Sequence, residues 1–372
     1  SRISNIFHYT SNLTINVVTS DFNHGSKRYK ECIDNINNHY LHVPAYKKNI
    51  SIERIYSHIV FAYRLKKFLN SLQEIPTVIY CAMPTSTAAY VCGKYCKKHG
   101  VKFVIDVIDL WPDSLRPIVA GIKNRLLNLF IFPWKYITIQ SYKMADVILG
   151  ESKKYVNEAA FYNHRAPIYP LYLGVDKKGV KKLVAESKLT LNKSNEERWI
   201  GYAGSLGMSY DFESLIKGVA VLNGKYQYKL SFIGDGVCRA KVENLINQYS
   251  VNAEITGFLK YGDLLKYLSY CDIALNIFRD KTKVVHSYKF NDYVATNCFI
   301  LNSLLGETAD MVDRYKVGLN FDFKDNTFDK VLLQCLEFWD EYREWKLNNE
   351  RLVDELLDKE AIYSQIETIL SK

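Results

Sequence analysis

The chain has 372 residues, of which 48% are hydrophobic and 24% charged. This composition excludes a disordered or fibrous chain, and the length is sufficient for two hydrophobic cores. The formal net charge of +9 favours an acidic partner, such as a nucleotide diphosphate, an anionic lipid or a nucleic acid, without choosing among them. No apolar run approaches the length of a membrane-spanning helix and no secretory signal is recognisable, so we expect a cytoplasmic protein.

The eight cysteines lie mostly in apolar surroundings, as the reduced thiols of a protein core do. Cys92 and Cys96 are four residues apart on an expected helix, but no CxxC pair and no matching histidine pair accompanies them. The sequence therefore predicts no metal site, and it indicates no cofactor.

The first half of the chain alternates strands with helices in the order that produces a parallel sheet. The expected elements are helix 1–12, strand 14–19, helix 51–72, strand 77–81, helix 86–99, strand 102–107, helix 123–144, strand 147–150 and strand 167–172. Pro133 is expected to break or kink the helix at 123–144 near its middle.

Residues 114–145 contain basic side chains and no acidic one, interleaved with large apolar side chains. A basic amphipathic segment with a tryptophan is typical of a protein that lies on an anionic lipid surface. Phe130, Phe132 and Trp134, around the expected break, are then candidates for insertion into that surface. The alternative is an ordinary core helix whose outer face is basic.

Residues 177–197 are charged and poor in aromatic residues, and we interpret them as the connection between two domains together with a surface helix. The predicted domains are then residues 1–176 and 177–372. The second domain alternates again, with strands near residues 199, 229, 254, 273, 299 and 317. The tail from residue 325 is expected to be helical.

Two glycine-containing turns follow expected strands of the second domain, GYAGSLG at 201–207 and FIGDG at 232–236. Backbone N–H groups at such a turn, just before a helix, can bind an anion. The third glycine of the dinucleotide fingerprint is missing, so an NAD-type site is disfavoured. The candidate residues of the two turns are Gly204, Ser205, Gly207, Gly234 and Asp235.

A third segment, SYKFNDYVA at 287–295, has the pattern of the start of a helix. Lys289 and Asp292 are three residues apart, so both side chains project from one face. The lysine can bind a diphosphate, and the carboxylate can accept both hydroxyls of a ribose. The alternative is a surface ion pair between the two residues.

Together these motifs resemble the donor-binding half of family 4 glycosyltransferases, which have the GT-B fold, and in particular the bacterial subgroup that builds capsule and O-antigen units. TGF at 256–258, which ends in Phe258, and GETADMV downstream belong to the same resemblance. In the first half it is carried by TSDFNHGSKRY at 19–29, YCAMPTSTAAY at 80–90 and FVIDVIDLWPDS at 103–114.

The resemblance implies an α/β architecture of two Rossmann-like, doubly wound parallel-sheet domains that face a cleft, with the last helix returning to the first domain. It implies transfer of a sugar from a nucleotide diphosphate sugar, with UDP favoured, to a lipid-linked saccharide in surface polysaccharide synthesis. The transfer is expected to retain the anomeric configuration and to need no tightly bound metal. The protein is expected to be peripheral on an anionic membrane, at the inner face of the plasma membrane.

The resemblance also implies roles for individual residues. Ser287, Lys289 and Asp292 are expected to bind the donor together with Phe258 and the two turns. Lys289 is expected to act as well on the departing diphosphate. Asp109, at the end of an expected strand, is the candidate for contact with the reacting sugar or the acceptor hydroxyl.

Two further residues are candidates on the acceptor side. Asp113 is the second choice after Asp109, although ordinary turn or helix-cap chemistry explains a carboxylate in this segment equally well. His24 is a polar loop residue near the expected cleft, and an ordinary surface histidine is its alternative.

The sequence departs from the family pattern in three places. Val284 stands where members commonly carry an acidic residue, and the turn SLGMSYD at 205–211 lacks the arginine that many members place beside the diphosphate. Lys217 or Arg279 is expected to supply the missing charge. The family's first strand and its glycine loop are expected to be absent, either because the chain is truncated or because its first sheet is one strand short.

Two other classes of function stay open at this point. A sugar-nucleotide epimerase shares the GT-B architecture but acts on a soluble substrate and needs no basic aromatic surface. A non-catalytic module that binds an anionic polymer has only the net charge in its support, because no recognised nucleic-acid motif is present. We therefore expect no nucleic-acid partner.

Overall fold

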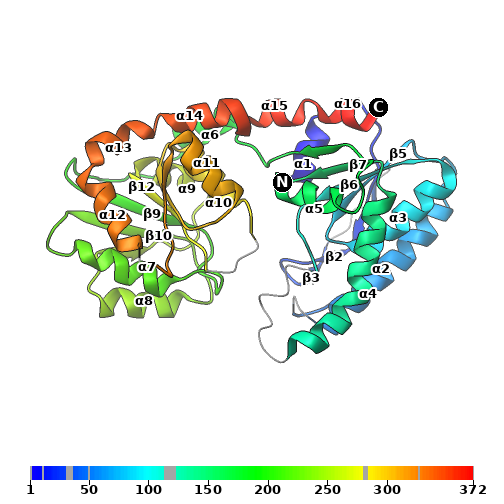
Figure 1. The fold of residues 1–372 in the computed structure, drawn as a ribbon, viewed down its shortest axis with the longest axis horizontal. Coiled ribbons are helices and arrows are strands. Elements are labelled where there is room, and N and C mark those ends of the chain that lie inside the picture. The colour runs from blue at the N-terminus through cyan, green and yellow to red at the C-terminus, as the bar shows by residue number, and fades with distance from the viewer. Residues whose placement is uncertain are drawn as a thin grey trace. The chain divides into compact units, whose positions relative to one another are not determined.

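The computed structural model describes residues 2–10, 12–30, 37–48, 51–112, 123–279, 284–325 and 327–371, and for residues 123–130 it describes the backbone alone. Contacts divide the chain into two compact units, Ser1–Tyr172 together with Tyr363–Lys372, and Leu173–Ile362. We name them the N-terminal unit and the C-terminal unit. Each has a parallel sheet accompanied by helices (Figure 1).

The N-terminal unit contains a four-stranded parallel sheet in the order β5-β6-β7-β8. Its strands are β5 (Val78–Met83), β6 (Lys102–Val107), β7 (Val147–Gly150) and β8 (Ile168–Pro170). Two short pairs accompany it, namely β1 (Val17–Ser20) parallel to β4 (Asn38–Leu41), and the hairpin of β2 (Phe22–Asn23) and β3 (Arg28–Tyr29). Its helices include α1 (Arg2–His8), α2 (Ile52–Asn70), α3 (Ser86–His99), α4 (Lys123–Met144), α5 (Lys153–Ala160) and α16 (Ile366–Ser371).

The strand β6 is buried from Phe103 to Val107, as a parallel strand with helices on both faces should be. Asp106 lies within this run, and Arg2 of α1 donates two hydrogen bonds to it, of 2.5 and 2.7 Å. Tyr80 also donates to Asp106, and Arg2 also donates to the backbone carbonyl of Leu171. One buried ion pair, supported by hydrogen bonds, therefore joins the first helix to the sheet.

Of the predicted break or kink at Pro133, the break is wrong, because the helix α4 continues through the proline. On the C-terminal side of the proline, the hydroxyl of Thr138 lies 2.7 Å from the hydroxyl of Ser86 on α3. The same hydroxyl of Thr138 lies 3.0 Å from the backbone carbonyl of Trp134. Packing against α3 therefore outweighs the one helical hydrogen bond that proline cannot donate.

The C-terminal unit contains a six-stranded parallel sheet in the order β11-β10-β9-β12-β13-β14. Its strands are β9 (Arg198–Ala203), β10 (Tyr228–Ile233), β11 (Ala253–Ile255), β12 (Ile273–Asn276), β13 (Phe299–Asn302) and β14 (Gly318–Asn320). Counted from β9 as the first strand, this is the order 3-2-1-4-5-6 of doubly wound nucleotide-binding folds. The winding reverses between β9 and β12, which is the place where such folds bind their ligands.

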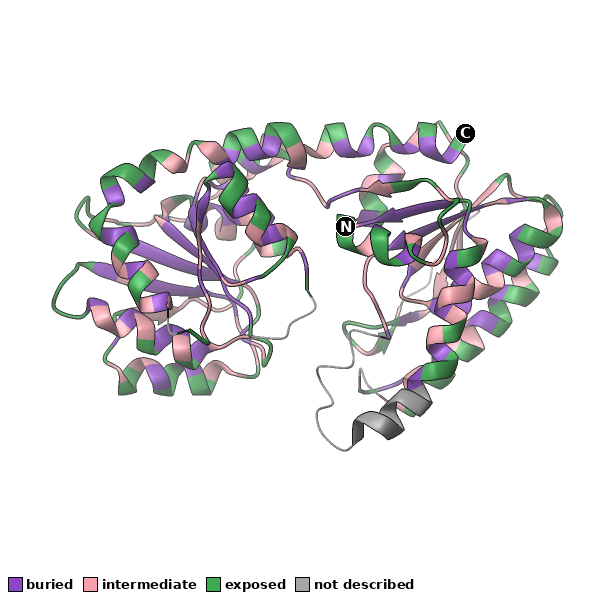
Figure 2. Ribbon diagram, viewed as in Figure 1, coloured by how far each residue is buried: buried purple, intermediate pink, exposed green. Residues whose placement is uncertain are grey.

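Helices flank this sheet, and buried residues are concentrated in the strands (Figure 2). The first group of helices is α6 (Lys177–Glu186), α7 (Phe212–Val219), α8 (Arg239–Gln248), α9 (Tyr261–Tyr270), α10 (Tyr288–Ala295) and α11 (Glu307–Tyr315). The helical tail follows with α12 (Phe328–Glu337), α13 (Trp339–Trp345), α14 (Asn348–Leu352) and α15 (Lys359–Tyr363). The predicted α/β class with parallel sheets is confirmed.

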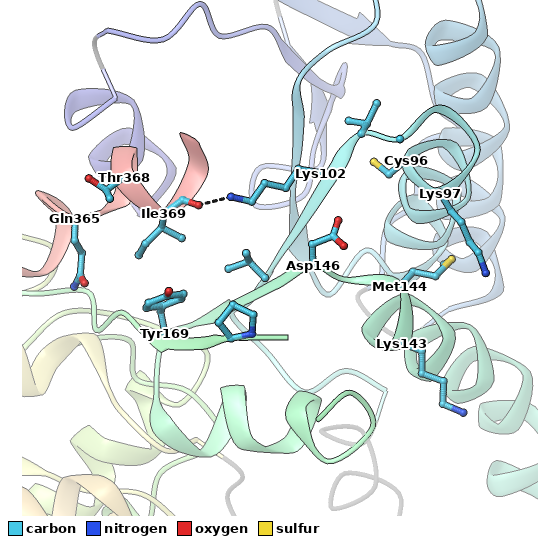
Figure 3. A pocket seen from close by; sticks show the side chains of 14 residues that line it. Cys96, Lys97, Lys102, Lys143, Met144, Asp146, Tyr169, Gln365, Thr368 and Ile369 are labelled. Atoms are coloured by element: carbon cyan, nitrogen blue, oxygen red, sulfur yellow. Dashed lines mark hydrogen bonds between the residues drawn. The ribbon is translucent and has the colours of Figure 1, made fainter. Parts of the chain in front are cut away.

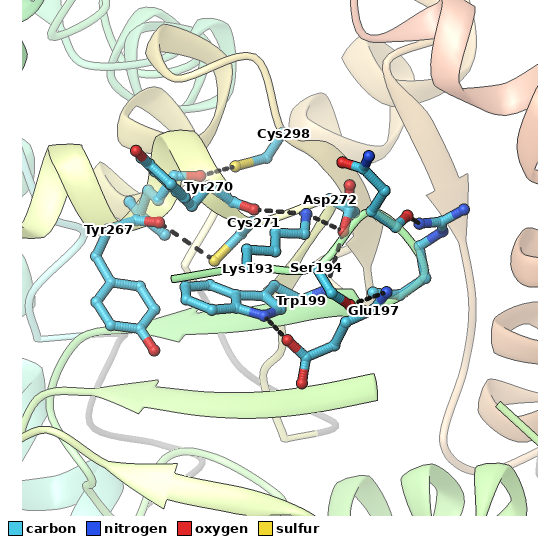
Figure 4. A network of polar contacts seen from close by, with 12 residues as sticks. Lys193, Ser194, Glu197, Trp199, Tyr267, Tyr270, Cys271, Asp272 and Cys298 are labelled. Atoms are coloured by element: carbon cyan, nitrogen blue, oxygen red, sulfur yellow. Dashed lines mark hydrogen bonds and ion pairs between the residues drawn. The ribbon is translucent and has the colours of Figure 1, made fainter. Parts of the chain in front are cut away.

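Residues 177–197, which we expected to form the connection between two domains and a surface helix, belong to the C-terminal unit and include the helix α6. After α6, the hydroxyl of Ser187 donates a hydrogen bond of 2.6 Å to Asp263 of α9. Lys193 forms an ion pair of 2.5 Å with Asp272, and Asp272 also accepts the backbone N–H of Trp199 at 2.9 Å (Figure 4). These contacts hold the segment at the amino ends of β9 and β12, the edge opposite the ligand-binding edge of such sheets.

Candidate functional site

The turns after β9 and β10 pack backbone against backbone at the carboxyl edge of the sheet. Gly204 donates its N–H to the carbonyl of Ile233 at 3.0 Å, and Leu206 donates to the carbonyl of Asp235 at 2.9 Å. A Cβ atom on Gly234 would lie 2.0 Å from the carbonyl oxygen of Gly204. Gly204 and Gly234 also have φ angles of +132° and +153°, which favour glycine. Both glycines are therefore needed for the two turns to meet.

The other predicted members of the turns have different roles. Gly207 lacks a positive φ, and a Cβ atom there would meet no heavy atom closer than 3.6 Å. Ser205 is exposed, and its carbonyl accepts a hydrogen bond of 2.9 Å from the hydroxyl of Tyr202. Asp235 uses both carboxylate oxygens locally, for a backbone N–H of its own turn at 2.7 Å and for Arg239 at 3.1 Å. The carboxylate of Asp235 therefore stabilises its turn.

The helix α10 begins beside the carboxyl end of β12, and Ser287 caps it. The hydroxyl of Ser287 accepts the N–H of Phe290 at 3.2 Å and donates to Asn276 Oδ1 at 2.8 Å. Ser287 is only 5% exposed and has the role of a cap, and its predicted contact with the donor stays a prediction.

A row of asparagines supports this cap. Asn276, Asn302 and Asn320 are the last residues of β12, β13 and β14 and lie in register. Asn276 donates to Asn302 at 2.7 Å, and Asn302 donates to Asn320 at 2.7 Å. Sequence reasoning missed this row, although an asparagine at the end of three successive strands is a signal that the sequence carries.

Lys289 extends from the first turn of α10 toward the turn after β9. Its ammonium nitrogen lies 3.9 Å from the ring centre of Tyr210, 4.4 Å from that of Tyr202 and 4.9 Å from that of Phe278. A Cβ atom on Gly204 would be 3.9 Å from the same nitrogen. Within the described part of the chain no carboxylate forms an ion pair with Lys289, and burial lowers its pKa to about 7. The three rings shield the ammonium group of Lys289, and an anion bound at the turn after β9 can pair with this group.

Asp292 lies one turn further along α10 and faces a different neighbour. Tyr261, the first residue of α9, donates its hydroxyl to the carboxylate at 2.7 Å. Burial raises the pKa of Asp292 to about 6, and the hydrogen bond from Tyr261 opposes that rise. No ion pair joins Asp292 to Lys289 among the described residues, so the structure does not support the alternative of a surface ion pair.

Tyr293 is a positioning residue that sequence reasoning missed. Its fully buried hydroxyl accepts the N–H of Ala203 at 2.9 Å and donates to the carbonyl of Leu275 at 3.1 Å. It therefore fixes α10 to the last residues of β9 and β12, where the sheet reverses its winding. In the sequence it cannot be told from an ordinary core tyrosine.

Arg279 and Lys217 were expected to replace the missing arginine. Arg279 reaches the turn after β9, because its Nε donates to the carbonyl of Tyr210 at 3.0 Å. Lys217 is exposed on α7, and Phe258, which follows β11, is 79% exposed. The structure therefore brings both Arg279 and Lys289 to the turn after β9.

The remaining candidates belong to the N-terminal unit. Asp109 is partly exposed two residues after the end of β6, at the carboxyl edge of that sheet. The Nδ1 atom of His24 lies 2.6 Å from the hydroxyl of Tyr46, and burial and the charges of Arg54 and Lys27 lower the pKa of this histidine. Asp113 and the side chain of Phe130 lie outside the described residues.

Phe132 and Trp134 differ sharply in exposure. Phe132 is 67% exposed, as insertion into a lipid surface requires, whereas Trp134 is 8% exposed. The ring centre of Trp134 lies 4.8 Å from the ring centre of Trp111 and 5.9 Å from that of His58. Side chains two residues apart on a helix point roughly 200° apart, so Phe132 and Trp134 face opposite sides. The predicted membrane role of Trp134 is therefore wrong.

A cavity of about 950 Å³ lies in the N-terminal unit, at the amino ends of β6, β7 and β8 (Figure 3). Lys97, Lys102 and Asp146 are among the side chains that line it. The helix α16 closes one side, where Lys102 donates to the carbonyl of Ile369 at 2.5 Å. The cavity is therefore at the edge of the sheet opposite to Asp109, whereas sheets of this type bind ligands at the carboxyl edge.

None of the helices that the structure describes is both long and apolar enough to span a membrane.

No protein-family model matches the sequence, and no curated protein does. The fold, in contrast, matches solved structures. Sucrose-phosphate synthase from Thermosynechococcus elongatus is 14% identical with a TM-score of 0.71, and the match covers 99% of this chain and 91% of that chain. WaaG, a glycosyltransferase involved in lipopolysaccharide biosynthesis, is 13% identical with a TM-score of 0.66, over 100% and 95%. HepE from Anabaena, in complex with UDP, is 13% identical with a TM-score of 0.62, over 90% and 86%. The chain therefore has the GT-B fold of these proteins.

Proposed function

We propose that the protein is a glycosyltransferase that takes a sugar from a nucleotide diphosphate sugar. The observation that carries the proposal is the placement of α10 at the point where the sheet reverses its winding. Lys289 lies there beside the glycine turn after β9, and Asp292 lies one turn further along the same helix. A turn able to bind an anion, a shielded ammonium group and a half-buried carboxylate are what a diphosphate followed by a ribose requires.

In this proposal, the diphosphate is bound by Lys289 and by backbone N–H groups of the turn after β9 other than those of Gly204 and Leu206, which donate to the turn after β10. Negative charge grows on the diphosphate as its bond to the sugar breaks, so the lysine stabilises the transition state more than the ground state. Arg279 adds positive charge at the same turn, and the carboxylate of Asp292 accepts hydroxyls of the ribose. Asp109 is our candidate for contact with the reacting sugar or the acceptor hydroxyl.

The nature of the donor and of the acceptor is also part of the proposal. HepE was solved with UDP and with UDP-glucose, and WaaG is involved in lipopolysaccharide biosynthesis. These relatives in fold support a UDP-sugar donor and a lipid-linked saccharide acceptor in surface polysaccharide synthesis, as the resemblance to family 4 capsule and O-antigen enzymes implies. We further propose that the transfer retains the anomeric configuration and needs no resident metal, and that the protein is peripheral at the inner face of the plasma membrane.

The test is the release of nucleoside diphosphate from a panel of nucleotide sugars, with and without a polyprenyl-diphosphate-linked saccharide. We expect release from a UDP-sugar that depends on the acceptor. Lys289→Met should lower the rate of release by more than it raises the donor Kd. Lys260→Met, at an exposed lysine before α9, is the matched control. Conversion of the donor sugar without an acceptor would identify an epimerase, and no reaction with any donor would reject both activities.

A further inference from the structure

The outward face of α2 carries large apolar side chains. Ile52 is 81% exposed, Tyr56 57%, Ile59 51% and Tyr63 59%. Their spacing of four, three and four residues places them on one side of the helix, and Ile55, which is 40% exposed, lies beside them. We name these five residues the α2 outer face.

The opposite side of α2 supplies the ordinary packing of the helix. Its buried residues are Ser57, Ala62, Leu65 and Leu69, and Leu65 and Leu69 belong to the core of the N-terminal unit. The helix is therefore apolar on both sides, and the α2 outer face is exposed on the N-terminal unit (Figure 2). Single exposed apolar residues are common on proteins, whereas a row of them over three turns marks a surface that binds something.

The charges around this face indicate what it binds. Within α2 the only acidic residue is Glu53, whereas Arg64, Lys66 and Lys67 are exposed at its C-terminal end. Lys47 and Lys48 are exposed shortly before the helix begins. Isoleucine supplies burial in the acyl boundary, tyrosine prefers the interface, and lysine attracts anionic headgroups. The ammonium group of Lys67 lies 4.8 Å from the ring centre of Tyr63, so an apolar body and a cation are combined at one place.

We infer that the α2 outer face docks on an anionic lipid bilayer. This inference rests on the proposed function, because a lipid-linked acceptor brings the enzyme to a membrane. It differs from the prediction for residues 123–135, since Trp134 is buried and α4 contributes only the exposed Phe132 and, beyond that range, Tyr136 among its described large apolar side chains. The α2 outer face presents more exposed apolar side chains, together with flanking cations.

The experiment is sedimentation of the whole chain with vesicles of phosphatidylcholine and phosphatidylglycerol in equal parts, and with vesicles of phosphatidylcholine alone. We expect binding to the mixed vesicles and at least about tenfold weaker binding to the neutral ones. Tyr56→Ser combined with Ile59→Ser should weaken binding to the mixed vesicles by at least about tenfold. Phe132→Ser combined with Tyr136→Ser is the matched control on α4 and should leave most of the binding intact.

A second variant tests the same face through its charges. Lys66→Gln combined with Lys67→Gln should reduce the preference for phosphatidylglycerol without changing the midpoint of thermal unfolding, since both side chains are exposed. The inference is overturned if the unmodified chain binds neither vesicle, or if the α4 variant alone abolishes binding. It is also overturned if Tyr56→Ser with Ile59→Ser dissociates a dimer in solution, because the occupant is then a second copy. Binding of UDP, measured on the same variants, reports on the donor site separately. Failure of the donor-site proposal can therefore be distinguished from failure of the membrane inference.

Discussion

The hydroxyl of Tyr261 donates a hydrogen bond of 2.7 Å to the carboxylate of Asp292, although the two residues are 31 positions apart in the chain. Tyr261 begins α9, and Asp292 lies in α10, so a neighbouring helix orients the group that we assign to the ribose. The bond also opposes the rise that burial causes in the pKa of Asp292. One hydroxyl therefore affects both the direction and the charge of the carboxylate.

Replacing Tyr261 by phenylalanine should raise the pKa of Asp292 further above its present value of about 6, because burial is then unopposed. The affinity for UDP should begin to fall at a higher pH than in the unmodified protein when the solution is acidified. Calorimetric titration of UDP over the range from about pH 5 to 8 measures this shift. Tyr226→Phe, at an exposed tyrosine before β10, is the control and should leave the pH profile of UDP binding unchanged. If Tyr261→Phe also leaves this profile unchanged, the hydrogen bond does not control the charge of Asp292 in UDP binding.

The donor site should have its highest affinity between about pH 6 and pH 7. The pKa of Lys289 is lowered to about 7, so its positive charge is lost as the pH rises through that value. The pKa of Asp292 is raised to about 6, so its negative charge is lost as the pH falls through that value. Binding of a diphosphate favours the charged lysine, and above about pH 7 the complex should take up a proton. Titration in buffers of different ionisation enthalpy measures that uptake, and a flat pH profile without uptake contradicts these assignments.

Gly234→Ala should abolish UDP binding and destabilise the C-terminal unit by about 3 kcal/mol or more, because strain at a positive φ adds to a clash. The added Cβ atom would lie 2.0 Å from the carbonyl oxygen of Gly204. Gly207→Ala is the matched control, since its Cβ atom meets nothing closer than 3.6 Å. Urea unfolding and UDP titration of the two variants make the comparison, and equal behaviour of both would show that the turns do not interlock as described.

Arg2→Ala should destabilise the N-terminal unit by about 3–5 kcal/mol, because it leaves the buried carboxylate of Asp106 without its partner. Arg2→Met combined with Asp106→Leu removes both charges and should recover much of that loss. Unfolding in urea, followed by circular dichroism, provides the comparison. If the double variant is as unstable as the single one, the pair contributes through packing and not through charge.

The sequence was sufficient to predict the elements with clear boundaries. The range of α3 was predicted as observed, because the helix ends at Gly100, whose φ of +69° suits a left-handed cap, after a last turn rich in basic residues. The range of β6 was also predicted as observed, because an apolar run of its length between turn residues is typical of a buried parallel strand. Strand β1 was expected at residues 14–19 and covers Val17–Ser20, and β2, β3 and β4 were not predicted, because strands of two to four residues within a polar segment carry too little pattern.

The candidate site could be predicted only in part, for a physical reason. Lys289 and Asp292 follow from residue type and helical spacing, which are local. The close approach of Gly234 to Gly204 and the bond from Tyr261 depend on contacts between segments about 30 residues apart, which the packing of the sheet decides. The burial of Trp134 was missed for a related reason, because a helix with apolar residues on more than one side does not reveal which side is packed.

The central claim is that α10 binds the donor through Lys289 and Asp292, and equilibrium titration of UDP near neutral pH tests it most directly. The unmodified protein should bind one UDP per chain. Asp292→Asn should weaken binding by about 10- to 100-fold, which corresponds to the loss of about 1.5–3 kcal/mol from a charge-assisted contact, while the midpoint of thermal unfolding without UDP stays the same. Unchanged affinity for UDP in both Asp292→Asn and Lys289→Met would contradict the claim.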